Sequence, residues 1–205
     1  MGDFRVAVVG QAFPYVPIAH PVRFVPDWTF GIRDDELQKV VDRLRQTEKV
    51  DAVVLLSHNC MDVDLKLAGR VTGIDIILDG HTHDAKPQPV SVANAGDKMI
   101  VSNTGWNGKF LAVLDLELKK GGVKDLRYWL LPVASQQLKA DSGTEALIER
   151  VRAPYGKTLD EKLSTADRLL YRRGNFNGTM DQLICDVLRQ QLDAEIALSP
   201  ASGGE

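Results

Sequence analysis

Residues 51–84, with the sequence DAVVLLSHNCMDVDLKLAGRVTGIDIILDGHTHD, decide the fold of this chain. Two apolar runs in this stretch lead into histidine: residues 51–56 precede Ser-His-Asn at 57–59, and residues 74–78 precede Gly-His-Thr-His-Asp at 80–84. Apolar runs of this length, bounded by polar and glycine residues and separated by a helix-length segment, predict parallel strands of an α/β sheet. Ligands of such sheets gather beyond the carboxyl ends of the strands, so the three imidazoles are expected to converge on one crevice.

His81 and His83 lie two residues apart, a spacing that suits two different metal ions. In an extended chain, residues i and i+2 project to the same side, about 6.5–7 Å apart. Dinuclear hydrolase sites hold their ions roughly 3.5–4 Å apart, so one histidine per ion is expected. Gly80 permits a tight turn before the pair, and Asp84 is predicted to accept the free ring N–H of a liganding histidine. In the alternative interpretation both are ordinary loop histidines; His58, at the end of the neighbouring strand, favours the metal site.

The regions on either side of this stretch predict further helices and strands. Asp34-Asp35 begins a helix whose apolar stripe is expected to pack on the sheet, and Asp62 or Asp64 is expected to cap a short helix that runs to Val71. The apolar stripe consists of Leu37, Val40, Val41 and Leu44. Two more helices are predicted, at residues 144–151 and after Thr179. The remaining strands are predicted at residues 4–9, 90–92, 99–103, 110–118, 123–131 and 194–198, with a hairpin turn at Gly121-Gly122.

The two histidine motifs resemble the last two metal-binding motifs of the calcineurin-like metallophosphoesterases, in their 5'-nucleotidase branch. Four flanking segments narrow this resemblance to the SoxB family, the thiosulfohydrolases of bacterial sulfur oxidation. These segments are Gln-Ala-Phe-Pro-Tyr at 11–15, Val-Pro-Asp-Trp-Thr-Phe-Gly at 25–31, Met-Asp-Val-Asp at 61–64 and Arg-Arg-Gly-Asn-Phe-Asn-Gly-Thr at 172–179. The resemblance extends over nearly the whole chain.

The resemblance implies two divalent metal ions, manganese in the first place, although zinc and iron also suit imidazole and carboxylate ligands. It implies that His58 and His81 serve one ion and His83 the other. Family members carry Asp-x-His, Gly-Asp and Gly-Asn-His segments before this portion, which supply the remaining ligands and a catalytic histidine. Before His58 the sequence offers only the pair Gly2-Asp3, which precedes a predicted strand, whereas a ligand should follow one. We therefore expect an internal piece of a longer enzyme. Three ligands cannot fill two coordination spheres, and this chain alone is therefore expected to bind metal weakly and to catalyse nothing.

The implied activity is a metal-assisted hydrolysis that releases sulfate from a thiosulfonate. The thiosulfonate is carried on a cysteine of a sulfur-carrier protein, which is the expected partner, and the family resemblance implies the periplasm. One alternative is a 5'-nucleotidase or cyclic-nucleotide phosphodiesterase that uses the same ions on a phosphate ester. An alternative of another class is a non-catalytic domain whose histidines are loop residues.

The resemblance also implies how the chain is divided. Residues 1–135 are expected to form the C-terminal part of a metallophosphoesterase-type α/β sandwich. Residues 136–155 are expected to be a linker with its own helix, and residues 156–205 the truncated start of the α+β C-terminal domain of 5'-nucleotidases.

Three asparagines and two arginines are further candidates near the ligands or the substrate. Asn59 follows the first histidine. Asn103 and Asn107 lie in a segment that resembles the loop closing over the metal edge in 5'-nucleotidase relatives, where their amides are suited to bind an oxyanion. Arg172 and Arg173 either face an anionic substrate or are surface residues, and paired arginines before a Gly-Asn turn favour the second interpretation.

Composition excludes several classes of partner. The 205 residues carry a formal net charge of −3, which gives no electrostatic case for nucleic acid or an anionic membrane surface. Their hydrophobic fraction of 44% is ample for a core, and no apolar run approaches the length of a membrane span. The two cysteines are Cys60 and Cys185. Cys60 stands where relatives usually have glycine, and a tolerated substitution is favoured over a functional thiol, because one thiolate among hard ligands has no evident role.

Overall fold

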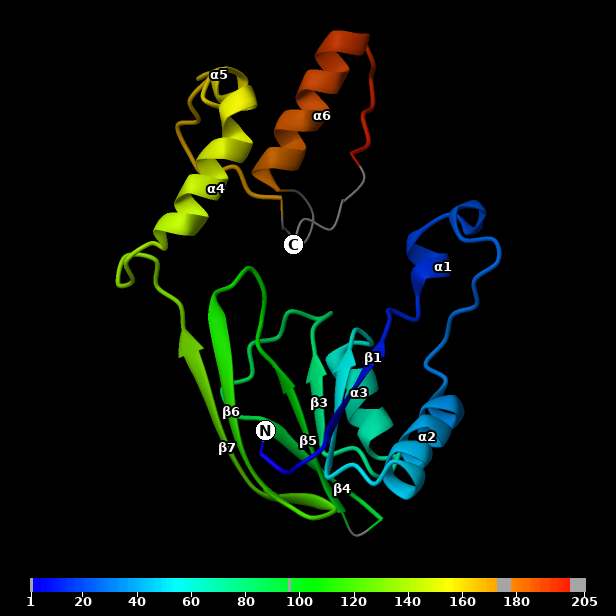
Figure 1. The fold of residues 1–205 in the computed structure, drawn as a ribbon. Coiled ribbons are helices and arrows are strands. Elements are labelled where there is room, and N and C mark those ends of the chain that lie inside the picture. Colours follow the sequence, from blue (N-terminus) through cyan, green and yellow to red (C-terminus); the bar gives the residue numbers. More distant parts are fainter. Residues whose placement is uncertain (1, 96, 173–177, 200–205) are drawn as a thin grey trace. The chain divides into compact units, whose positions relative to one another are not determined.

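Four short apolar strands form a parallel sheet, because aliphatic and β-branched side chains suit strands that are buried by packing. In the computed structural model these strands are β1 (Val6–Gln11), β2 (Ala52–Ser57), β3 (Ile76–Asp79) and β5 (Asp97–Asn103). β4 (Val90–Asn94) is antiparallel to β5, and the order across the sheet is β1-β2-β3-β5-β4 (Figure 1). The predicted mixed α/β fold with a parallel sheet is confirmed.

The structure describes residues 2–95, 97–172 and 178–199. The chain divides into two compact units, Met1–Lys139 and Ala140–Glu205. The division falls inside the segment 136–155 that the sequence predicts to be a linker.

The register of the parallel strands aligns their last residues. Gln11 pairs with Ser57, Ser57 with Asp79, and Asp79 with Asn103. Because paired residues of a sheet project to the same face, four polar side chains stand in a row at the carboxyl edge. Leu55, two residues before Ser57, is fully buried, so this row lies on the face of the sheet that carries the core.

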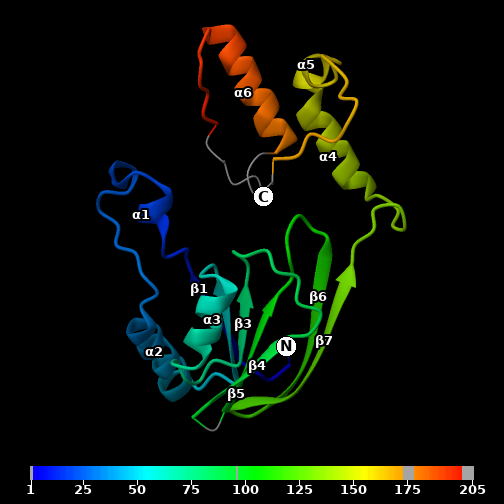
Figure 2. The same ribbon diagram turned by 180° about the vertical axis from the view of Figure 1, so that it is seen from behind.

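Two helices cover that face of the sheet. They are α2 (Asp34–Asp42), which continues into the π-helical turn η2 (Arg43–Thr47), and α3 (Met61–Ala68) (Figures 1 and 2). The largest fully buried apolar side chains between helices and sheet are Val41, Val53, Leu55, Leu67, Val71, Ile77 and Val101. The predicted apolar stripe of α2 packs into this core: three of its members are buried and Val40 is packed against them.

The remaining elements of the first unit lie outside this layer pair. Two short helical turns follow β1, namely α1 (Val16–Ala19) and η1 (Val22–Phe24). A long hairpin of β6 (Phe110–Lys119) and β7 (Gly122–Pro132) forms a second, two-stranded sheet. The hairpin turns at Gly121, whose φ of +79° favours glycine, as the Gly-Gly pair of the sequence predicts.

The second unit is helical in its described part. It contains α4 (Ser142–Arg152), the 3₁₀ turn η3 (Ala153–Tyr155), α5 (Gly156–Leu159) and α6 (Thr179–Leu192). Asp141 caps α4, because its carboxylate accepts a hydrogen bond of 2.8 Å from the Thr144 N–H. Arg172 donates a hydrogen bond of 3.2 Å to Asp181 within this unit, whereas Arg173 lies outside the described residues, as do residues 174–177 of the same motif.

The strand predicted at 194–198 is wrong. Asp193 ends α6 in the left-handed conformation, with φ of 51°, and residues 194–199 have no regular structure. An apolar run becomes a strand only where another strand satisfies its backbone N–H and C=O groups. None of the described strands pairs with this run.

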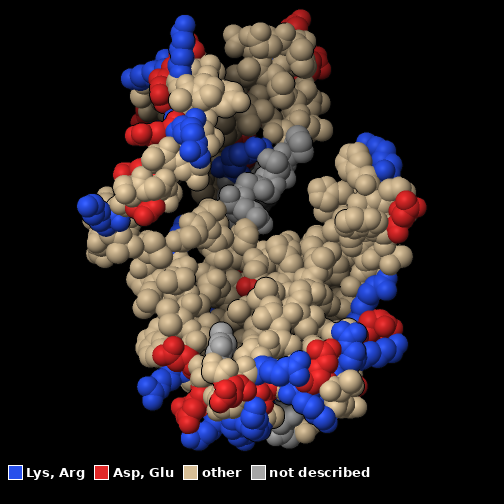
Figure 3. All heavy atoms as spheres, viewed as in Figure 1, with Lys and Arg blue, Asp and Glu red and all other residues tan. Residues whose placement is uncertain are grey.

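The charged side chains of the first unit are mixed in sign. Figure 3 shows lysine, arginine and carboxylate side chains interspersed around a large uncharged area on the visible face. This distribution agrees with the small net charge of −3. Among the described helices, none is long and apolar enough to span a membrane.

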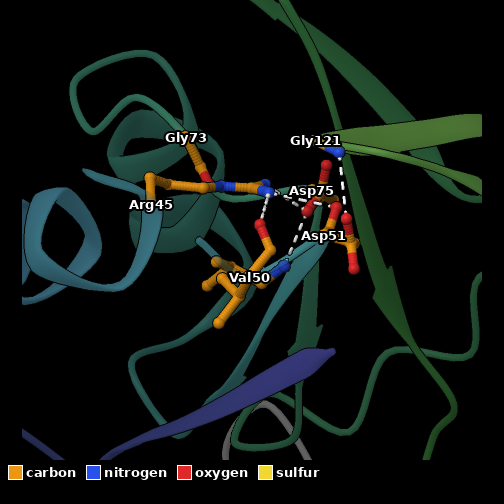
Figure 4. A network of polar contacts seen from close by, with 7 residues as sticks. Arg45, Val50, Asp51, Gly73, Asp75 and Gly121 are labelled. Carbon is orange, nitrogen blue, oxygen red and sulfur yellow. Dashed lines mark hydrogen bonds and ion pairs between the residues drawn. The ribbon is translucent and has the colours of Figure 1, made fainter. Parts of the chain in front are cut away.

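Arg45 ties the start of β3 to the segment that leads into β2 (Figure 4). Its guanidinium donates to the carbonyl oxygens of Gly73 at 2.8 Å, Val50 at 3.2 Å and Asp51 at 3.1 Å. It also forms an ion pair of 2.5 Å with the carboxylate of Asp75, and both side chains are largely buried. One guanidinium therefore satisfies three backbone acceptors and one charge at the amino edge of the sheet.

Asp51 joins the hairpin to the sheet at the same edge. Its carboxylate accepts backbone hydrogen bonds from Arg5 at 2.9 Å and from Gly121 at 3.1 Å. These two bonds lower the pKa of Asp51, because both stabilise the ionised form. The turn of the hairpin is thus held against the start of β2.

Replacing Arg45 should strongly destabilise the first unit. Arg45→Met removes the cation beside the buried Asp75 carboxylate, which keeps the Val53 N–H as a donor at 2.7 Å, and it removes the Arg45 N–H groups from three carbonyl oxygens. The free energy of unfolding should fall by about 3 kcal/mol. The matched control is Arg43→Met, because the Arg43–Glu48 pair is exposed and 3.4 Å long, and should cost less than about 1 kcal/mol. Urea denaturation followed by circular dichroism measures both, and equal losses would contradict the assignment.

Candidate functional site

The predicted histidines lie at the carboxyl edge of the sheet. His58 follows the last residue of β2 directly, and His81 follows the last residue of β3 by two positions. Their imidazole rings are neighbours, with centroids 4.8 Å apart and planes at 60°. Two imidazoles from different strands at this separation can serve one ion between them, as the resemblance implies for this pair.

Phe13 covers both rings. It stacks on His81 with centroids 4.3 Å apart and planes at 28°, and meets His58 edge to face at 5.9 Å. Tyr15 in turn meets Phe13 edge to face at 5.6 Å. The loop after β1 thus places aromatic rings beside the imidazole pair, and Phe13 covers one face of His81 by stacking on it.

His83 lies beside Trp106 rather than in the stacked group of Phe13, His58 and His81. The His83 and Trp106 rings are stacked with centroids 5.7 Å apart and planes at 14°, and the Lys109 ammonium lies 3.8 Å from the centre of the Trp106 ring. His83 has φ of 57°, so the backbone turns at this residue instead of continuing in the extended form assumed for the His-Thr-His spacing. This turn carries His83 towards the loop after β5.

Of the other residues predicted at this edge, two are exposed and two are fully buried. Asp84 is exposed and accepts a hydrogen bond of 2.9 Å from the Thr82 hydroxyl. Asn107 is also exposed and has φ of 57°. Asn59 and Asn103 are fully buried, and their amides are engaged with other side chains beneath the histidines.

Asn59 belongs to a network centred on Asp64 of α3. The Asp64 Oδ1 atom accepts hydrogen bonds from the Ser57 hydroxyl at 2.8 Å and from the Asn59 amide at 3.0 Å. The same amide donates to Gln11 Oε1 at 2.8 Å. The prediction that Asp62 or Asp64 caps the helix is therefore wrong: Cys60 occupies the N-cap position, and no side chain caps the helix there. Asp64 turns inward because the polar row of strand ends offers it two donors.

Asn103 forms the second network. Its amide donates to Asp79 Oδ2 at 2.6 Å and to the Thr82 hydroxyl at 3.3 Å, and its Oδ1 accepts from the Gly105 N–H at 3.0 Å. Both ends of the Asn103 amide are therefore used inside the protein. This geometry suits Asn103 to hold the loop that carries His81 rather than to bind an oxyanion.

The two networks meet between Asp64 and Asp79. One carboxylate oxygen of each, Asp64 Oδ2 and Asp79 Oδ1, is buried without a hydrogen-bond partner among the described residues. The pKa of Asp64 is raised to about 6, mainly by burial. The hydrogen bonds from Ser57 and Asn59 act in the opposite direction, and the neighbouring Asp79 carboxylate acts in the same direction as burial. A proton held by Asp64 would give the pair the donor that it otherwise lacks.

Cys60 has a backbone conformation that favours glycine. Its φ of 99° and ψ of 144° belong to a region that residues with a Cβ atom rarely adopt. Glycine, which the resemblance implies at this position, would adopt this conformation without strain. Burial is the first cause that raises the pKa of the Cys60 thiol, followed by the charges of Asp62 and Asp79. The thiol is therefore protonated near neutral pH and poorly suited to bind metal.

The donor set of the edge fits part of a metal centre. His58 and His81 are close enough for a shared ion, and imidazole suits the first-row metals expected here. Within the part of the chain that the structure describes, no three His, Cys, Asp or Glu side chains converge on a single metal position. The pair thus offers two of the three ligands that the resemblance implies.

Sequence reasoning missed Gln11, Asp64 and Asp79 as parts of the site. Asp79 had a usable signal, because it is a polar residue that ends an apolar run in the same way as Ser57. Gln11 ends β1, whose predicted end was two residues too early, so its alignment with Ser57 was hidden. The inward direction of Asp64 depends on the register of three strands and left no signal in the local sequence.

Comparisons with known proteins agree with this architecture. No family model matches the chain. The structure of the sulfate thiohydrolase SoxB from Thermus thermophilus, solved with glycerol, is 38% identical and superposes on 94% of this chain with a TM-score of 0.82. A 5'-nucleotidase precursor from Thermus thermophilus is 23% identical over 94% of the chain, with a TM-score of 0.80, and shows the fold alone.

A curated relative gives the same picture. The 5'-nucleotidase of Bos taurus is 25% identical over 92% of this chain. The chain spans about a third to two fifths of the length of these relatives, namely 35% of the bovine protein, 34% of the SoxB chain and 41% of the Thermus nucleotidase. These similarities support the 5'-nucleotidase and metallophosphoesterase superfamily as the class of this protein. Within that class, SoxB has a higher identity than either nucleotidase.

Replacing Cys60 by glycine should stabilise the first unit. Relief of the strained φ should add about 1 kcal/mol to the free energy of unfolding, after the entropy cost of glycine is subtracted. Cys60→Ala is the matched control, because alanine removes the thiol but keeps the Cβ atom, and should give no such gain. Urea denaturation of the three proteins measures the difference. A gain from alanine as large as that from glycine would place the cause in the thiol.

Asp64 should make the stability of the protein fall between pH 4 and pH 7. Its folded-state pKa of about 6 lies above the usual 3.8, so the folded state binds more protons than the unfolded state in this window. Stability due to this group is present below pH 4 and is lost as the pH rises through 6, by up to roughly 3 kcal/mol. Asp64→Asn should remove the fall, whereas the exposed neighbour variant Asp62→Asn should keep it. Unfolding free energies measured from pH 4 to 7 decide this.

Proposed function

We propose that this chain forms part of a metal-dependent thiosulfohydrolase, which releases sulfate from a cysteine-bound thiosulfonate on a sulfur-carrier protein. The observation that carries the proposal is the contact of His58 and His81 at the carboxyl edge of the sheet, where α/β proteins bind their ligands. The choice of sulfur substrate rests on the flanking motifs and on the 38% identity to SoxB, compared with 23% and 25% for the two nucleotidases.

His58 and His81 would hold one divalent ion and His83 the second, with manganese proposed, although the same ligand set also suits zinc or iron. Bound there, such ions supply an acidified water molecule and polarise the oxygens of the sulfonate. Asp64 holds the loop that carries His58, and Asn103 holds the loop that carries His81. Phe13 covers one face of the His81 ring.

The proposed reaction is a hydrolysis without a redox change. The oxygen of water bonds to the sulfonate sulfur, and the bond between that sulfur and the next one breaks. Sulfate is released, and the carrier keeps the leaving sulfur as a persulfide thiolate, while the protons of the water pass to solvent. This sulfur carrier is the proposed partner, and the proposed location is the periplasm.

A 5'-nucleotidase or cyclic-nucleotide phosphodiesterase is the second candidate, because the bovine 5'-nucleotidase is similar over 92% of the chain. The two candidates share the same edge and differ in the group that is hydrolysed. A nucleotidase would break a phosphate ester, and its substrate would carry a nucleoside in place of a protein-bound sulfur chain.

Product analysis distinguishes the candidates. The whole protein, supplied with Mn²⁺, should release sulfate from a thiosulfonated carrier protein and little phosphate from a 5'-nucleotide. His81→Ala should lower sulfate release by more than about 100-fold, beyond the usual effect of losing an outer partner of a ligand. His20→Ala is the matched control, because His20 is an exposed loop histidine. Phosphate release in place of sulfate would favour the nucleotidase, and equal effects of the two variants would reject the metal site.

A further inference from the structure

We propose that Asp64 is a positioning residue that directs the His58 imidazole towards His81. The inference rests on the proposed function, since it concerns a ligand of the proposed ion. Asp64 lies outside the two histidine motifs and is not itself proposed as a metal ligand. The side chain acts through the two neighbours of His58.

The first step of the argument is that Asp64 binds the residues on both sides of His58. Its Oδ1 atom accepts from the Ser57 hydroxyl at 2.8 Å and from the Asn59 amide at 3.0 Å. The Ser57 hydroxyl oxygen also accepts from the Asn59 backbone N–H at 3.2 Å. One carboxylate oxygen thus closes a ring of hydrogen bonds around the backbone of His58, and this ring fixes the direction in which the Cα–Cβ bond of His58 points.

The second step is that β1 holds the same loop from its other side. The His58 backbone N–H donates to the Gln11 carbonyl at 3.1 Å, and the Asn59 amide donates to Gln11 Oε1 at 2.8 Å. The side chain of His58 is nevertheless exposed, although Ser57 and Asn59 are buried. An exposed ring on a rigid backbone can meet His81 reproducibly, whereas the same ring on a mobile loop would explore several rotamers.

The third step concerns the cost of the arrangement. Asp64 is fully buried, and burial of a carboxyl group is unfavourable unless its oxygens are bonded. Its Oδ2 atom has no hydrogen-bond partner among the described residues, so the group is only partly compensated. Costly buried polar groups are expected where a functional site requires them. The buried Asp64 carboxylate maintains the ring of hydrogen bonds around the His58 backbone.

The test uses Ser57→Ala, which removes the hydroxyl that links Asp64 to the Asn59 backbone. The matched control is Ser102→Ala, because Ser102 is also buried at a strand end but projects to the opposite face and bonds to the Tyr128 hydroxyl at 3.1 Å. Two quantities are measured on the whole chain: the affinity for Co²⁺, and the order and tautomer of the His58 ring by ¹⁵N-edited NMR of the metal-free protein.

Ser57→Ala should weaken Co²⁺ binding by about tenfold or more, the effect typical of losing a partner that orients a ligand. It should also broaden or shift the His58 ring signals and leave those of His20 unchanged. Ser102→Ala should change the affinity by less than about twofold. Asp64→Ala should reproduce the NMR change of Ser57→Ala. Asp64→Asn should cause a smaller change of the same kind, because an amide oxygen can still accept both hydrogen bonds.

Unchanged His58 signals in a folded Ser57→Ala or Asp64→Ala protein would overturn the proposal. Equal losses of Co²⁺ affinity in the two serine variants would overturn it as well, because the effect would then be one of stability. The failure of the proposed function looks different. In that case the wild-type chain fails to bind Co²⁺ through His58 and His81, while the NMR measurement still reports whether Asp64 orders the His58 ring.

Discussion

The parallel register of four strands is the constraint on which the rest of the structure depends. It brings Gln11, Ser57, Asp79 and Asn103 into one row on the face of the sheet that also carries the core. A row of polar side chains at the margin of an apolar core has to find hydrogen-bond partners inside the protein. Some of these partners come from helix α3 and from the row itself, and others from the loops that follow the strands, which also carry the histidines. The stability of the edge and the placement of the imidazoles are therefore consequences of one arrangement.

The two networks divide this task between them. Asp64 holds the loop of His58 and Asn103 holds the loop of His81, and both are fully buried. The functional side chains are less buried than the residues that hold them, since His58 is exposed and His81 half-buried. This division is common in sites that must bind a ligand, because the outer groups need access while their supports need rigidity. His83 stacks on Trp106, which follows β5.

Much of the fold could be predicted from the sequence because its signals are local. Short apolar runs indicated the strands, the spacing of Leu37, Val41 and Leu44 indicated the covering helix, and Gly121 marked the hairpin turn. The errors also have local causes. The run at 194–198 has the composition of a strand but no partner among the described strands, and Asp64 has the position of a cap but meets two donors inside the protein. Propensity describes what a segment can do, and its surroundings decide between the possibilities.

By itself, the sequence determined the α/β class, the three histidines at two strand ends and the resemblance to the 5'-nucleotidase branch, because strand runs and short motifs are written in consecutive residues. Only the tertiary structure decided that His58 and His81 meet beside Phe13, that His83 has a positive φ and stacks on Trp106, and that Asp64 lies next to Asp79. These relations depend on the register between strands far apart in the chain, and register is set by packing of the whole core rather than by any one segment.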